Sequence, residues 1–129
     1  MGIRIYPDEN DPTIVRWDIE GRWTWDDYHH ARTDSDRIGQ GVERFDIVCD
    51  MRRAGPVPVS PATLHIKHGL DNALPAWGIC VLVGPDAFVR VMVSLVQRVL
   101  PKARNTFFLA DSVEQAHEII SRARARQTT

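Results

Sequence analysis

The histidines are the first residues whose chemistry stands out, because imidazole binds metal ions and transfers protons near neutral pH. His65 and His68 are three residues apart, so on a helix they would share a face and could hold a metal ion. His29 and His30 are adjacent and would diverge by about 100° on a helix. Zinc takes four ligands, and nothing near His65 and His68 supplies an ordered cysteine or carboxylate partner. The sequence therefore predicts two solvated helix histidines, with no metal site and no cofactor.

Asp50 is the best placed acidic residue, because it follows a short apolar run that predicts a strand, and ligands of open α/β sheets gather at the carboxyl ends of strands. A phosphorylated receiver aspartate would need acidic residues after the first parallel strand and a lysine after a later one; Gly84 and Ala110-Asp111 follow the later strands, and no such lysine appears. Cys49 and Cys80 lie in apolar runs and are expected to fill the core. No phosphate-binding loop, dinucleotide-binding glycine pattern or nucleophile elbow is present. We therefore expect no catalytic residues and no enzyme.

The composition indicates one globular domain spanning residues 1–129, because 43% of the residues are hydrophobic and 26% are charged. The net charge is −1, which gives no support for binding to nucleic acid or to a membrane surface. No apolar run approaches the ~20 residues of a membrane span, and the charged beginning of the chain does not look like a signal peptide. The expected location is the cytoplasm.

Apolar residues at alternating or helical spacing divide the chain into short elements. The sequence predicts strands over residues 3–6, 13–20, 45–49, 78–83 and 106–109, and helices from Thr24 to about Gly39 or Gly41, from Ser60 to Pro75, from Gly84 to Pro101, and from Asp111 or Ser112 onward. Strands that alternate with helices favour a mostly parallel sheet, and the first hairpin adds an antiparallel edge. The predicted fold class is therefore α/β, with a mixed central sheet of about five strands and about four helices.

Three local expectations follow from the same patterns. Residues 51–59 contain two prolines and a glycine, which predicts an irregular loop, followed by a helix with Ser60 as N-cap and Pro61 in the first helical position. The third helix is predicted to be the clearest amphipathic one. His117 is expected on the surface of the last helix, and the basic tail over residues 122–126 is expected to fray. The apolar residues of the third helix follow one another at a spacing of three to four: Phe88, Val91, Met92, Leu95, Val96 and Val99.

Several motifs in the second half of the chain carry a resemblance to a known family. An apolar strand over 78–83 leads through Gly84-Pro85-Asp86 into a helix, and a second strand over 106–109 leads to a helix that starts Asp111-Ser112-Val113-Glu114-Gln115-Ala116. This pattern, and the element order of the chain, resemble the STAS (SpoIIAA-like, anti-sigma factor antagonist) family. The resemblance implies a STAS-like domain that acts as a regulatory or protein-interaction module and not as an enzyme.

The chain departs from that family at its phosphorylation motif. Regulators of the anti-sigma type carry Asp-Ser-Ser-Gly at the start of the second helix, and this chain has Val59-Ser60-Pro61-Ala62. Ser60 is the one candidate phosphoacceptor that the resemblance leaves, and its alternative role is that of a helix N-cap. The candidate partner-binding loop comprises Asp50, Arg52, Arg53, Val57, Val59, Ser60 and Asp86.

Two functions stay open at this point. The first is a module that contacts another protein, or a second copy of the chain through the first hairpin or the long apolar helix. The alternative is a carrier or sensor of a small apolar ligand, because Trp17, Trp23, Trp25 and Tyr28 cluster in sequence and the loop around Val57 is apolar. A cavity beneath the loop would favour the carrier, whereas a filled core with a flat apolar patch would favour the interaction module.

Overall fold

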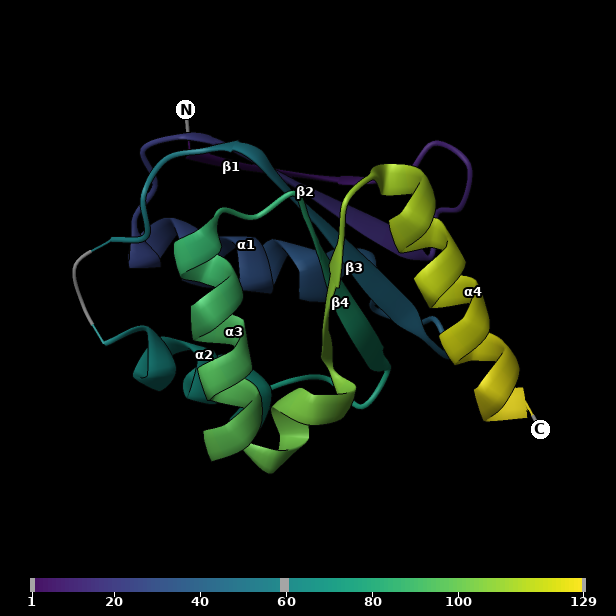
Figure 1. The fold of residues 1–129 in the computed structure, drawn as a ribbon. Coiled ribbons are helices and arrows are strands. Elements are labelled where there is room, and N and C mark those ends of the chain that lie inside the picture. The colour runs from purple at the N-terminus through teal and green to yellow at the C-terminus, as the bar shows by residue number, and fades with distance from the viewer. Residues whose placement is uncertain (1, 59–60, 129) are drawn as a thin grey trace.

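The computed structural model describes residues 2–58 and 61–128, which form one five-stranded sheet in the order β1-β2-β3-β4-β5 (Figure 1). Strand β1 (Gly2–Pro7) pairs antiparallel with β2 (Ile14–Gly21). Strands β2, β3 (Phe45–Ala54), β4 (Trp77–Val83) and β5 (Phe107–Ala110) pair in parallel. The predicted α/β class, with a mixed sheet and an antiparallel edge, is confirmed.

Four helices cover the two faces of this sheet. Helices α1 (Trp25–Ile38), α2 (Ala62–Asp71) and α3 (Ala87–Val99) lie on one face, and α4 (Val113–Thr128) lies on the other (Figure 1). A short 3₁₀ helix, η1 (Pro101–Asn105), connects α3 to β5. The crossovers that a parallel sheet requires therefore all run on the face of α1–α3, and α4 alone closes the opposite face.

Side-chain caps fix where three of the helices begin. Thr24 and Asp27 form a capping box, in which the backbone N–H of Asp27 donates to Oγ1 of Thr24 over 3.0 Å and the backbone N–H of Thr24 donates to Oδ2 of Asp27 over 2.9 Å. Asp86 accepts the backbone N–H of Val89 over 2.9 Å at the start of α3. Ser112 caps α4 by accepting the backbone N–H of Gln115 over 3.1 Å. These local signals explain why the element order could be predicted.

The loop after Asp50 begins later in the structure than the sequence predicts. Strand β3 continues to Ala54, because β2 runs beside it as far as Gly21 and, after an irregularity between Asp18 and Glu20, pairs Glu20 with Arg53 and Gly21 with Ala54. The prolines of the loop follow only after this pairing ends. Helix α2 begins at Ala62 with Pro61 in the N-cap position, so the prediction of Pro61 as the first helical residue is wrong. The predicted N-cap, Ser60, lies outside the described residues.

The C-terminal helix also differs from the prediction. Residues 122–126 are helical and do not fray, because Arg124 reaches back to the body of the domain. Its Nε donates to Oδ2 of Asp46 over 2.8 Å, and its Nη1 donates to Oδ2 of Asp11 over 2.9 Å. His117 is only partly exposed, and its Nε2 lies 3.3 Å from Oδ1 of Asp8. The last helix is therefore held to the sheet along its length by polar as well as apolar contacts.

Candidate functional site

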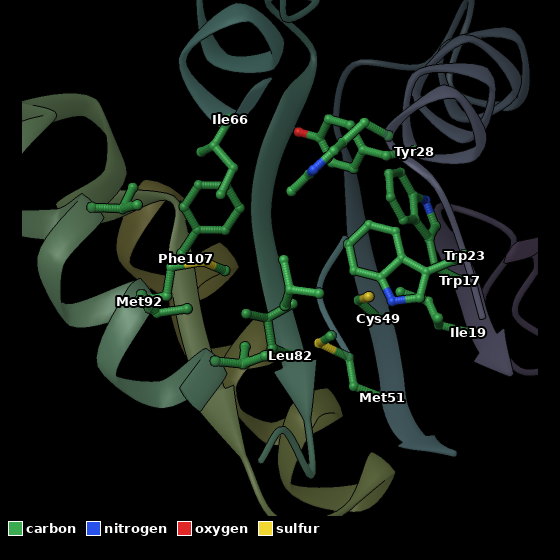
Figure 2. A pocket seen from close by; sticks show the side chains of 15 residues that line it. Trp17, Ile19, Trp23, Tyr28, Cys49, Met51, Ile66, Leu82, Met92 and Phe107 are labelled. Carbon is green, nitrogen blue, oxygen red and sulfur yellow. The ribbon is translucent and has the colours of Figure 1, made fainter. Parts of the chain in front are cut away.

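An apolar cavity of about 80 Å³ lies between the sheet and helices α1–α3. Strand residues form its floor, among them Trp17 of β2, Cys49 of β3 and Leu82 of β4 (Figure 2). Met92 of α3 and Ile66 of α2 close it from the helix side. The cavity therefore lies where three crossover helices meet the centre of the parallel sheet.

Four aromatic side chains form one side of the cavity, and they are the cluster that the sequence singles out. Trp23 and Trp25 meet edge to face with ring centroids 5.1 Å apart, and Tyr28 packs in the same way on Trp25 at 5.5 Å and on Trp17 at 5.8 Å. The indole N–H of Trp17 donates to Oγ of Ser35 over 2.6 Å. Such T-shaped pairs are rigid and favourable, so this side of the cavity is a fixed aromatic frame.

The opposite side is made of aliphatic and thioether side chains. Val89, Val93 and Val96 of α3 are buried against the cavity, and Met92 lies beside them. Met51 extends from β3 toward the same space (Figure 2). Methionine is unbranched and adapts to the shape of what it touches. The cavity thus has one rigid aromatic side and one side that can adjust to an occupant.

The cavity is partly open to solvent and is larger than the voids usual inside a small domain. Protein interiors contain few voids larger than a water molecule, and about 10–15 Å³ is enough space to hold one water. The observed cavity of about 80 Å³ is several times that size. Its lining is almost wholly apolar, and apart from the indole N–H groups of Trp23 and Trp25 water inside would find few hydrogen-bond partners. The cavity therefore suits an apolar occupant better than water.

The lining offers no group for acid–base or nucleophilic chemistry. None of the described residues that line the cavity is an Asp, Glu, Lys, Arg or His. Burial raises the pKa of the Cys49 thiol well above its ordinary value, so the thiol stays protonated. Burial likewise raises the pKa of Tyr28 to about 12. The arrangement of these side chains can hold a molecule, and no lining residue carries a charge at neutral pH.

The structure divides the predicted partner-binding loop among three environments. Val57 lies in the lining of the cavity, and Asp86 is engaged as the cap of α3. Arg53 lies in β3 and pairs with Glu20 over 2.9 Å. Val59 and Ser60, which the sequence also assigns to this loop, lie outside the described residues.

Asp50 and Arg52 belong to a polar hollow on another part of the sheet. Nη2 of Arg52 lies 2.7 Å from Oδ2 of Asp50, and the hydrogen bonds from Arg52 hold the pKa of the Asp50 carboxyl below its ordinary value. The hollow measures about 240 Å³. The other described residues that line it are Arg4, Arg16, Asp18, Ile19, Glu20 and Arg53. Its charges largely pair with one another, so Asp50 is a member of an ion-paired surface.

Three histidines meet beside the aromatic frame, which the sequence did not reveal. Nε2 of His29 on α1 lies 2.9 Å from Nδ1 of His65 on α2, and the ring of His65 stacks on Trp25 at 4.5 Å. His68 approaches His29 edge to face at 5.3 Å. His65 is therefore partly buried among aromatic rings, whereas His68 is exposed. No group of three or more His, Cys, Asp or Glu in residues 2–58 and 61–128 is arranged to hold a metal ion.

Comparison with protein-family models, with curated proteins and with solved structures finds no match to this chain. The resemblance to the STAS family stays a prediction that rests on sequence pattern. Among the described residues, the helices are all too short or too polar to cross a bilayer. The cavity is therefore the feature from which a function has to be argued.

Proposed function

We propose that this protein binds a small apolar molecule in the cavity between the sheet and helices α1–α3, as a carrier or sensor of that molecule. The observation that carries the proposal is the cavity of about 80 Å³ with an apolar lining. Val57, from the loop that follows β3, contributes to this lining. This is the arrangement that favours a carrier over a module with a filled core.

The lining indicates the chemical class of the ligand. Ring edges and faces on one side, and Met51, Met92 and Leu82 on the other, offer dispersion contacts and no charge. Each buried methylene contributes about 0.8 kcal/mol to binding, so a single ring or a short branched or linear hydrocarbon group would gain several kcal/mol. The ligand is therefore a molecule whose bound part is hydrocarbon.

Binding can be tested with a neutral single-ring probe, toluene, by isothermal titration calorimetry, and with a pair of matched variants on α3. Val93 is 7% exposed and lines the cavity, whereas Val91 is 70% exposed on the outer side of the same helix. We expect Val93→Phe to fill the cavity and weaken probe binding by at least about tenfold, since more than 1.4 kcal/mol of contact is lost. Val91→Phe makes the same change outside the cavity and should leave binding unchanged.

A second, smaller variant guards against misfolding of the first. Val93→Leu adds one methylene to the same place. It should weaken binding of the probe less than Val93→Phe does, and it should keep the far-ultraviolet circular dichroism of the native chain. Equal binding by the native chain and by both Val93 variants would show that the probe does not occupy the cavity, and the proposal would then be wrong.

A second candidate function is the STAS-like regulatory or protein-interaction module. It is favoured by Arg52 and Arg53, whose side chains are 53% and 79% exposed next to each other near the carboxyl end of β3. Native mass spectrometry of the protein isolated gently from its own cells distinguishes the candidates. A complex with another protein would support the module, and a small adduct lost on denaturation would support the carrier. A phosphate retained after denaturation would support Ser60 as a phosphoacceptor.

A further inference from the structure

Helix α3 has a second apolar side, which faces away from the cavity. Its exposed residues form one stripe at a spacing of three to four, and their exposed fractions are 62% for Phe88, 70% for Val91, 52% for Leu95 and 55% for Val99. Single exposed apolar residues are normal, but a continuous stripe of large ones marks a contact surface. The sequence predicted one amphipathic helix from these residues, and the structure places four of the six predicted residues outside.

The charge of this segment differs from that of the whole chain. Residues 87–105 contain four basic residues and no acidic one, in a chain with 16 basic and 17 acidic residues. Arg90 pairs with Asp111, and Lys102 lies 3.6 Å from Asp71. Within the described residues, Arg98 and Arg104 form no ion pair with an acidic side chain. The apolar stripe is thus combined with uncompensated positive charge.

Arg98 lies beside the apolar stripe. It follows Leu95 by three residues and Val91 by seven, so the three side chains share one side of the helix. Arg104 follows in η1, just beyond the end of α3. An apolar stripe flanked by basic side chains is the pattern of a helix that lies in the plane of a membrane surface, with apolar residues among the acyl chains and cations at the headgroups.

We infer that α3 and η1 dock on an anionic lipid surface. Phe88, Val91, Leu95 and Val99 enter the boundary between headgroups and acyl chains, and Arg98 and Arg104 contact the lipid phosphates. The inference goes beyond the proposed function and does not require an occupied cavity. It also gives that cavity a source of ligand, because the opposite side of α3 lines it through Val89, Val93 and Val96.

A second copy of the chain fits this surface less well than a lipid bilayer does. A 13-residue helix is about 20 Å long and about 10 Å wide, so one side of it offers on the order of 200 Å². A stable dimer buries about 800 Å² on each partner. Two copies that met along α3 would also bring the basic side chains of residues 87–105 together with no acid from that segment to pair with them. A membrane surface supplies both the extended apolar layer and the negative charge.

The experiment measures co-sedimentation of the full chain with vesicles of phosphatidylcholine alone and of phosphatidylcholine mixed with phosphatidylglycerol. We expect binding to the anionic vesicles that weakens as salt is added, and weaker binding to the neutral ones. Leu95→Gln should weaken binding by at least about tenfold. Ser94→Gln, one residue away on the polar side of the same helix, should leave it unchanged.

A second pair of variants tests the charges. Arg98→Gln should weaken binding to anionic vesicles by about fivefold, since each basic side chain near the surface contributes about 1 kcal/mol. Arg53→Gln, which removes an exposed charge from β3, should have no effect. No binding to anionic vesicles at low salt, or equal losses for Leu95→Gln and Ser94→Gln, would overturn the inference. A dimer in light scattering that Leu95→Gln dissociates, without vesicle binding, would assign the surface to a second copy instead.

The two proposals fail in different ways. Leu95→Gln should keep binding of toluene in solution, because the side chain of residue 95 lies outside the cavity. The Val93→Phe variant should bind the probe weakly and still bind anionic vesicles. If the chain binds vesicles and not the probe, the lipid-surface inference stands and the carrier proposal is wrong. If it binds the probe and not vesicles, only the carrier proposal stands.

Discussion

The two faces of the sheet are packed in different ways. On the face of α4, small and β-branched side chains pack closely, and Val48, Val81, Val83 and Ala116 are all 0% exposed. An open hollow of about 420 Å³ lies beside Ile79, Phe108 and Ala123 of the same face. On the face of α1–α3, large aromatic rings meet valines and methionines and leave a cavity of about 80 Å³. Cavities cost stability, so this difference indicates that the α4 face stabilises the fold and that the other face retains space for an occupant.

A charged cluster adds to the difference between the two faces of the sheet, because it holds α4 to the sheet. Asp46 of β3 is completely buried and accepts the backbone N–H of Ile79 over 2.7 Å. Its carboxylate also accepts hydrogen bonds from Nη2 of Arg44 over 3.0 Å and from Nε of Arg124 over 2.8 Å. One buried carboxylate therefore joins two strands and the last helix.

The largest expected effect follows from removing that carboxylate. We expect Asp46→Ala to lower the free energy of unfolding by about 3–5 kcal/mol, because Arg124 and the N–H of Ile79 lose their buried partner. Urea denaturation measures the loss. Asp34→Ala removes an exposed pair with Arg37 and should change stability by less than about 1 kcal/mol. Similar losses for the two variants would contradict the role assigned to the α4 face.

A matched pair of valines compares the two faces directly. Val81 is 0% exposed on the filled face, and Val93 is 7% exposed at the cavity. We expect Val81→Ala to cost about 2–3 kcal/mol of unfolding free energy, since it creates a void in a filled core. Val93→Ala should cost about 1 kcal/mol, because a side chain beside an existing void has already lost part of its contacts. Equal costs would mean that the cavity face is packed as tightly as the other.

The sequence predicted the element order because its signals are local. Thr24, Asp86 and Ser112 begin helices through side-chain caps that lie within a few residues. The length of β3 was underestimated because Arg53 and Ala54 are in a strand only by virtue of their pairing with β2. The sequence also could not predict which side of α3 faces the sheet, because both sides of that helix are apolar.

The candidate site was predictable only in part. The aromatic frame was visible because Trp17, Trp23 and Trp25 are close in sequence. Ile66 and Phe107 reach the cavity from distant elements, so their role depends on the topology. The net charge gave no indication of a basic surface, because the acidic residues that balance it lie outside residues 87–105. A count of charges within each element would have revealed this asymmetry.

The smallest expected effect concerns the histidines at the edge of the cavity face. Burial, and then His65 and His68, lower the pKa of His29 from its ordinary value of 6.5, while Asp26 opposes the shift and Arg32 adds to it. The unfolded chain therefore binds more protons than the native one as the pH falls below 6.5, so the stabilising contribution is present above that pH and is lost as the pH falls through the lowered pKa. The hydrogen bond between His29 and His65 also requires one neutral ring.

Urea denaturation across this pH range gives the measurement. The native chain should lose stability as the pH falls below 6.5, and His29→Gln should flatten that dependence because it removes the titrating ring. His30→Gln removes the adjacent histidine, which takes no part in the ring contacts with α2, and should keep the dependence of the native chain. An unchanged pH profile in His29→Gln would show that protons do not act through the α1–α2 contact.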